Sequence, residues 1–198
     1  MPRRLFLFDA PDRFVAGTIG EPGNRSFFLQ ARDGSRIVSV LLEKVQVAVL
    51  AERLGALLDE LERRGLADTK VDTASEDVAP LDEPLNEVFR AGTLSLGWDG
   101  DSDAIVVEAR AIVETDEEAE EGAEERAEEE DDEPEEVADD DPEGPDLIRV
   151  RMAAPNARRF VDRAVRVVAS GRPPCPLCGQ PLDPQGHLCP RRNGTYVN

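Results

Sequence analysis

Residues 26–64 of this 198-residue chain read SFFLQARDGSRIVSVLLEKVQVAVLAERLGALLDELERR, and this stretch decides what kind of fold to expect. In its first half, two apolar segments flank Asp33-Gly34, a dipeptide typical of two-residue β-hairpin turns. Residues 25–32 and 35–43 are therefore predicted to form adjacent antiparallel strands.

In the second half, from Lys44 to Arg64, the period of the apolar residues changes. They recur at intervals of three and four positions, which predicts a helix with one apolar face, and Gly65 supplies its end. This face consists of Val47, Leu50, Leu54, Leu57, Leu58 and Leu61. A strand hairpin followed directly by an amphipathic helix indicates a fold that mixes the two kinds of element.

Outside this stretch, the chain contains more short apolar segments, separated by turn residues. The alternation in residues 147–153 favours an edge strand, and the polar residues 66–85 are predicted to form a connection. Further strands are predicted at residues 3–8, 13–20, 87–99 and 104–113. A second helix is predicted at 155–170, with an apolar face formed by Phe160, Val161, Ala164, Val165 and Val168.

The C-terminal segment PPCPLCGQPLDPQGHLCPRR, residues 173–192, contains all three cysteines of the chain and its single histidine. Cys175 and Cys178 are predicted to share a tight turn, and His187 and Cys189 follow as a second pair. Four such ligands suit tetrahedral Zn²⁺ with no open coordination position, so a structural Zn²⁺ site is predicted. A redox-active Cys-x-x-Cys pair and unligated thiols are the alternatives, although the glycine and proline that follow oppose the helix such redox pairs usually begin.

These elements together predict an α+β fold. Each helix has one apolar stripe and needs one surface to cover, which a sheet offers. We expect an antiparallel-rich sheet of about seven strands with two helices on one face, plus a small C-terminal zinc-binding loop. The α+β domain is predicted to span residues 1–170, and a zinc-ribbon-like module residues 171–198.

The formal net charge of −20 comes from one insertion in the first domain. Residues 114–146 carry twenty-one acidic residues and a single arginine, whereas residues 147–198 carry two acidic residues and nine arginines. A segment with so few apolar residues and one dense sign of charge is predicted to be disordered. We interpret it as a solubilising loop or, alternatively, as a polyanion that folds back on the basic C-terminal quarter.

Targeting and membrane signals are missing from the sequence. No run of about eighteen apolar residues is present, as a transmembrane helix would need. The N-terminal residues lack the long apolar core of a signal peptide, and cysteines confined to one motif argue against a secreted disulfide framework. We therefore expect a cytoplasmic protein without a membrane partner, and the sequence makes no prediction of its oligomeric state.

Four segments also resemble a known family: FDAPDRFVAGTIGEPGNRSFFLQARDG, EKVQVAVLAERL, AGTLSLGWDG and ASGRPPCPLCGQPLDPQGHLCPRRNG. Together they are similar to the actinobacterial family known as domain of unknown function 3090. The resemblance covers nearly the whole chain apart from the acidic insertion. It implies no activity, but members of that family tend to be encoded beside a phosphoinositide-kinase-like protein and a histidine-phosphatase-like protein.

Signs of catalysis are weak. The predicted zinc site uses the histidine and all the cysteines, and AGTLSLG lacks the lysine that a phosphate-binding loop needs. The best acid–base candidates are Asp9, Asp12 and Glu21, in turns of the predicted N-terminal hairpins, where turn capping is the simpler interpretation. An enzyme is therefore the least favoured class.

A binding protein is the favoured class. We expect an adaptor with a protein partner, such as the kinase-like or phosphatase-like neighbour, and nucleic acid is the alternative. The alternative rests on arginines that could neutralise phosphates. Those predicted on the exposed side of the second helix or near the zinc loop are Arg158, Arg159, Arg163, Arg166, Arg172, Arg191 and Arg192.

Overall fold

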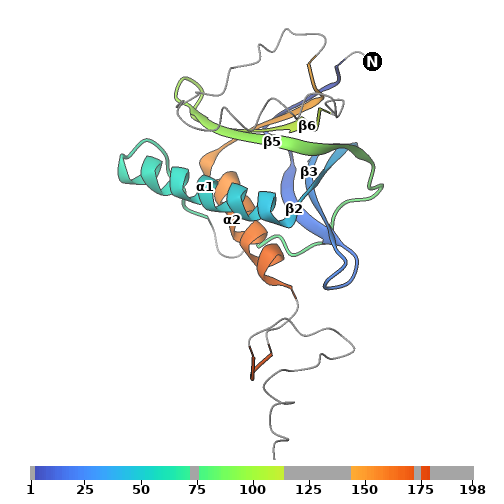
Figure 1. Ribbon diagram of the computed structural model, residues 1–198. Helices are drawn as coiled ribbons and strands as arrows, with labels where there is room; N and C mark the ends of the chain where they lie inside the picture. Colours follow the sequence, from blue (N-terminus) through green and yellow to red (C-terminus); the bar gives the residue numbers. More distant parts are fainter. Residues whose placement is uncertain (1–2, 72–75, 114–143, 172–174, 179–198) are drawn as a thin grey trace, which may run out of the picture.

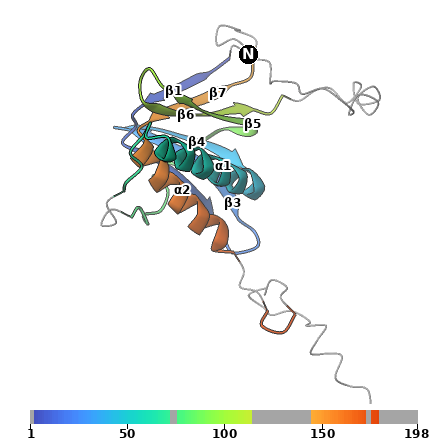
Figure 2. The ribbon, with the colours of Figure 1, turned by 90° about the vertical axis from the view of Figure 1, so that its left-hand side faces the viewer.

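The computed structural model describes residues 3–71, 76–113, 144–171 and 175–178 (Figures 1 and 2). It confirms an α+β fold with one seven-stranded sheet and two helices. The strands are β1 (Leu5–Asp9), β2 (Arg13–Ile19), β3 (Ser26–Asp33), β4 (Arg36–Leu42), β5 (Glu87–Asp99), β6 (Ala104–Ala111) and β7 (Leu147–Met152), and the helices are α1 (Lys44–Arg63) and α2 (Ala154–Ala169). Neither helix is long and apolar enough to cross a membrane.

The sheet is mixed, and the prediction of an antiparallel-rich sheet was wrong in this respect. Its strand order is β1-β7-β6-β5-β4-β3-β2. The β1–β7 and β4–β5 pairs are parallel, and the other four are antiparallel. The chain crosses over through α1 between β4 and β5, which is how two parallel neighbours are connected. β7 lies between β1 and β6, so the prediction that it forms an edge was also wrong.

The sheet is strongly curled. β1 and β2 are the two outermost strands, yet only residues 10–12 connect them. A sheet can bring its two edges so close only if its twist accumulates into a curl. A contact between strands from the two halves of the strand order supports this curl. Arg36 Nη1 on β4 donates a hydrogen bond of 3.0 Å to the carbonyl oxygen of Leu7 on β1. The N-terminal strand therefore pairs with β7 instead of forming the predicted hairpin with β2.

Both helices lie on the concave side of the sheet, where they close the hydrophobic core (Figure 2). The predicted stripe of α1 is buried, apart from Leu57, which is half-buried. On α2 the stacked pair Phe14–Phe160 joins the helix to β2, with ring centroids 4.7 Å apart. Val165 was predicted to lie in the core, but its side chain is 54% exposed.

The polar connection between α1 and β5 covers the opposite face of β2, β3 and β4. Gln30, whose strand neighbours point into the core, is 1% exposed and donates hydrogen bonds to Ser39 Oγ and the Asp82 carbonyl oxygen, both at 3.0 Å. The Asp82 amide in turn donates to Gln30 Oε1 at 2.7 Å. Leu81 fills the space above Gly17, where a Cβ atom would lie 2.5 Å from Leu81 Cδ2.

Candidate functional site

A group of paired charged side chains is centred on Arg163 of α2. We predicted that this arginine is exposed, but it is 7% exposed, so the prediction was wrong. Its Nε donates to the Ala16 carbonyl oxygen at 2.8 Å, which satisfies an edge group of β2. Its two terminal nitrogens donate to the carbonyl oxygens of Asp77 and Ala79, at 2.8 and 2.7 Å. A guanidinium is readily buried when its donors have such partners.

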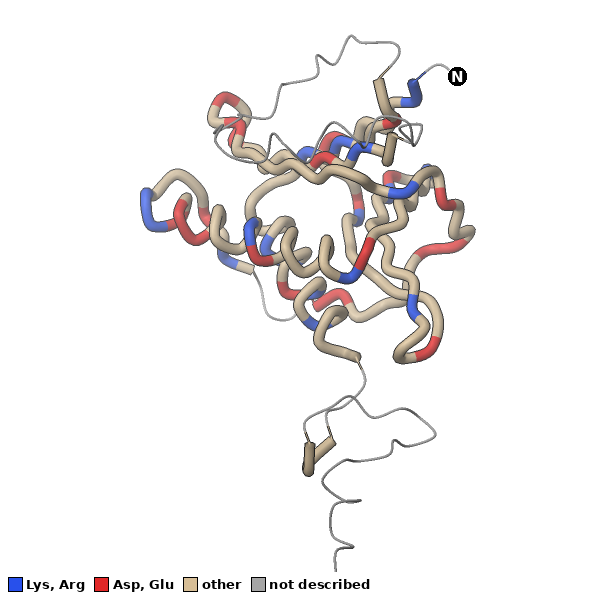
Figure 3. Tube along the Cα trace, viewed as in Figure 1, with Lys and Arg blue, Asp and Glu red and all other residues tan. Residues whose placement is uncertain are grey.

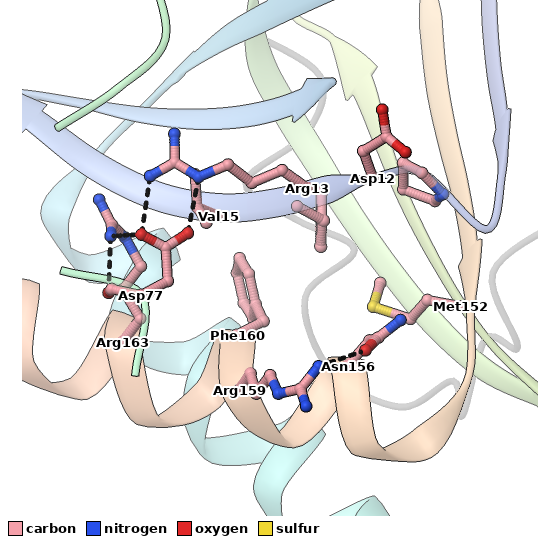
Figure 4. Close-up of a pocket in the computed structure, with 11 residues that line it drawn as sticks. Asp12, Arg13, Val15, Asp77, Met152, Asn156, Arg159, Phe160 and Arg163 are labelled. Atoms are coloured by element: carbon pink, nitrogen blue, oxygen red, sulfur yellow. Dashed lines mark hydrogen bonds and ion pairs between the residues drawn. The ribbon is translucent and has the colours of Figure 1, made fainter. Parts of the chain in front are cut away.

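Arg13 of β2 reaches the same aspartate from the other side (Figure 4). Arg13 forms two hydrogen bonds to the Asp77 carboxylate, at 2.6 and 2.9 Å, and a third to Asp82 Oδ2 at 2.7 Å. Arg163 Nη1 also donates to Asp77 Oδ1 at 2.8 Å. Asp77 is thus held by two arginines from two different elements. We call Arg13, Asp77, Asp82 and Arg163 the arginine–aspartate cluster.

The charges in this cluster shift the titration of its members. The hydrogen bond from Arg13 and the nearby charges of both arginines lower the pKa of Asp77, although its partial burial acts in the opposite direction. The same hydrogen bond raises the pKa of Arg13. For Arg163, burial dominates and lowers the pKa, while the charge of Asp77 opposes this. The aspartate therefore stays ionised, with both of its oxygens accepting hydrogen bonds.

A cavity of about 250 Å³ lies beside the cluster, between β2 and the first turns of α2. Arg159, whose Nη1 donates to Asn156 Oδ1 at 3.1 Å, lines it together with Asp12. Asp12 accepts a hydrogen bond from the Gly34 amide at 2.9 Å, as a turn-capping carboxylate does. Asp9 and Glu21 do not line this cavity. The three predicted carboxylates therefore do not meet at one site.

The predicted arginine face is also divided in the structure. Arg158 pairs with Asp59 of α1, and Arg166 pairs with Glu76. Arg159 has no carboxylate partner within the described ranges. Figure 3 shows basic positions next to acidic ones, not gathered into one area. The remaining predicted arginines, Arg172, Arg191 and Arg192, lie outside the residues that the structure describes.

A larger hollow, about 520 Å³, lies between α1 and β5, and we call it the α1–β5 groove. Its apolar lining includes Val45 and Val49, which are 64% and 38% exposed, and the half-buried Leu94 and Leu96. The groove was not predicted from the sequence, because most of its lining residues lie outside the buried stripe of α1. Two valines four residues apart, on the side of the helix away from that stripe, were the available signal.

Only part of the predicted zinc site lies within the described residues. Cys175 is buried, and the Leu177 amide donates to its Sγ at 3.4 Å. Cys178 follows in the same turn. His187 and Cys189 lie outside the described residues, and within the described ranges no three potential metal ligands come together.

A family model with the description "Protein of unknown function (DUF3090)" matches residues 6–189. The chain belongs to the DUF3090 family. This confirms the family resemblance seen in the sequence. No curated protein and no solved structure was found to match the chain.

The matched region of this DUF3090 protein includes both hollows and all four predicted zinc ligands. The two hollows differ in what they leave available to a ligand. Beside the smaller hollow, the charged side chains of the arginine–aspartate cluster form ion pairs with one another, and these pairs hold β2, α2 and the connection together. The α1–β5 groove instead leaves apolar side chains in contact with solvent, which is typical of an interaction surface.

Proposed function

We propose that this DUF3090 protein is a zinc-containing, non-catalytic adaptor that binds a protein partner in the cytoplasm. The observation that carries the proposal is the α1–β5 groove, where Val45 and Val49 are exposed beside Leu94 and Leu96. Exposed apolar side chains gathered in one hollow lose contact with water when a partner covers them, and this burial favours binding.

The arginine–aspartate cluster supports a non-catalytic function. A general base must accept a proton, but Asp77 accepts hydrogen bonds from two arginines and its pKa is lowered. Such a carboxylate is a weak base. Asp12, the predicted acid–base candidate that lines the adjoining cavity, caps a turn.

The ion pairs of α2 favour a protein partner over nucleic acid. Arg158 and Arg166, two of the predicted phosphate-binding residues, already pair with carboxylates. A phosphate would have to displace those carboxylates before it could gain their charge. The kinase-like and phosphatase-like proteins implied by the family resemblance are the first partners to test.

The zinc proposal rests on the spacing of Cys175, Cys178, His187 and Cys189 in the sequence. The hydrogen bond from the Leu177 amide to Cys175 Sγ supports it, because donors of this kind stabilise a thiolate, the form that binds metal. We assign the Zn²⁺ a structural role, since four protein ligands leave no position for a substrate.

Binding of purified partners tests the adaptor function. The full chain is mixed with each of the two neighbouring proteins, and complex formation is measured by calorimetry and light scattering. We expect a stoichiometric complex with one of them. If neither forms a complex, but the purified protein retains RNA or turns over a substrate, the corresponding alternative function replaces the adaptor.

Elemental analysis tests the metal separately. We expect one zinc per chain in protein purified without chelators, and less in Cys178→Ser. Circular dichroism of that variant should keep most of the sheet signal, because the predicted loop is too small to stabilise the sheet. Iron in place of zinc, or no metal, would refute the assignment.

A further inference from the structure

The long strand β5 has one edge that is only partly paired. β6 pairs with it along most of its length, from Ala91 to Asp99. On the other edge, β4 pairs only with residues Glu87 to Arg90, because the chain then leaves the sheet to begin α1. Within the described part of the chain, no strand continues this edge beyond Ala91. Backbone groups on such an edge can pair with another extended chain.

Helix α1 runs beside this open edge and forms the second wall of the α1–β5 groove (Figure 1). At one end of the groove, Gln46 Nε2 donates to the carbonyl oxygens of Ala91 and Gly92, at 3.1 and 3.2 Å. This side chain satisfies the first open groups of the edge and fixes the helix against the strand. Beyond it, the groove is bounded by the apolar pairs Val45–Val49 and Leu94–Leu96.

The lining of the groove also includes one charged side chain, that of Arg53. Val45, Val49 and Arg53 are spaced by four residues, so they form a single stripe along α1, and all three line the groove. Arg53 forms no ion pair within the described ranges, although most arginines of the described domain do. The stripe therefore presents two apolar side chains followed by a cation that has no carboxylate partner.

We propose that the α1–β5 groove binds an extended peptide segment of a partner protein, which adds to the open edge of β5 as an eighth strand. This inference rests on the proposed adaptor function and names the kind of segment that is recognised. Main-chain hydrogen bonds to β5 supply part of the affinity, and apolar side chains on one face of the segment pack between Val45, Val49 and Leu96. A carboxylate of the segment pairs with Arg53, and this charge complementarity sets its register.

An extended segment fits these features better than a helix does. A helix uses its own backbone donors and acceptors internally, so it could not satisfy the edge of β5. A strand has free groups along both edges, and its side chains alternate between its two faces. One face can therefore meet the groove while the other stays in solvent.

The test uses the full chain and a phage-displayed library of random peptides. We expect the selected peptides to share apolar residues at alternate positions and an acidic residue or terminal carboxylate beyond them. Val49→Glu should weaken binding of a selected synthetic peptide by about tenfold or more, because it places a charge in the apolar contact. Arg53→Glu should weaken binding to a similar extent. When the acidic residue of the peptide is replaced by a neutral one, the affinities of Arg53→Glu and of the unchanged protein should become nearly equal.

Matched variants on α2 serve as controls. Val165→Glu also places a charge on an exposed valine, and Arg159→Glu also reverses an arginine without a carboxylate partner. Both should leave peptide binding unchanged. Hydrogen exchange followed by NMR should show new protection at alternate backbone amides between Thr93 and Trp98 when the peptide binds, which side-chain contacts alone would not produce.

Four outcomes overturn the inference. The first three are a library without enriched peptides, peptides that bind Val49→Glu as well as the unchanged protein, and binding without protection of the β5 amides. The fourth is dimerisation through β5 in the absence of peptide, which would show that a second copy covers the edge instead. None of these outcomes bears on complex formation with the neighbouring proteins. Failure of the peptide-binding inference can therefore be distinguished from failure of the proposed adaptor function.

Discussion

Two hollows in the described part of this protein, the cavity beside the arginine–aspartate cluster and the α1–β5 groove, both lie between a helix and a strand of the same sheet. At the first, arginines from β2 and α2 converge on Asp77 and hold the connection against the edge of β2. At the second, Gln46 links the helix to the strand and Glu43 at the start of α1 pairs with Arg90 of β5, but exposed apolar side chains line the space. One strand edge is thus covered by the chain itself, and the other is left open.

From this difference we expect stability and the proposed binding to depend on different parts of the protein. An uncovered strand edge promotes association, and proteins usually cover or charge it. Here the β2 edge is covered by residues 76–79 and by Arg163, whereas the edge of β5 beyond Ala91 is not. Substitutions at the first site should therefore change the free energy of unfolding, and those at the second should change binding.

Removal of the carboxylate at the centre of the cluster should have the largest effect. Asp77→Ala leaves Arg163 buried without its counter-charge, and we expect a loss of about 3 kcal/mol in the free energy of unfolding. Urea denaturation followed by circular dichroism measures it. Asp12→Ala, on the exposed wall of the same cavity, should cost less than about 1 kcal/mol. Equal losses in the two variants would show that the cluster does not fix the connection.

Crowding the contact between β2 and the connection should have a somewhat smaller effect. Gly17→Ala places a Cβ atom 2.5 Å from Leu81 Cδ2, and we expect a loss of about 1–3 kcal/mol from overpacking. The double variant with Leu81→Ala should lose less than the sum of the two single losses, because the second change makes room for the first. Gly97→Ala, where nothing lies within 4 Å of the added atom, is the control.

The charge of Asp77 should also make stability depend on pH. Its folded-state pKa is below the ordinary value of 3.8, so the folded state binds fewer protons than the unfolded chain in acid. The stabilisation is complete above the unfolded-state pKa and is lost as pH falls through the folded-state pKa. The difference in unfolding free energy between the unchanged protein and Asp77→Asn should therefore be largest at neutral pH and shrink as the pH falls below the ordinary pKa of 3.8. A constant difference would assign the effect to shape and not to charge.

The smallest effect on stability is expected in the groove. Val45 is 64% exposed at the start of α1, so Val45→Glu should change the free energy of unfolding by less than about 0.5 kcal/mol. A negative charge in the first turn of a helix is, if anything, favourable. The same urea measurement checks this. A loss comparable with that of Asp77→Ala would mean that the groove belongs to the core and is not an open surface.

The sequence by itself determined the elements of this protein and one candidate site. All seven strands and both helices occur where local periodicity and turn residues predict them, and four segments of the sequence carry the family resemblance. The spacing of Cys175, Cys178, His187 and Cys189 is likewise a local pattern, although His187 and Cys189 lie outside the described residues. Such features can be predicted from the sequence because hydrogen bonding and side-chain direction within one element depend on its own residues.

Only the tertiary structure decided which strands are neighbours and which polar residues are buried. The curl of the sheet pairs β1 with β7 and brings residues 76–79 to the edge of β2. Arg163 was predicted to lie on the exposed side of the second helix, but the carbonyl groups that allow its burial come from Ala16, Asp77 and Ala79. The open edge of β5 arises in the same way, since it depends on where β4 leaves the sheet. These properties join residues that are distant in the chain, so no local pattern of apolar and polar residues encodes them.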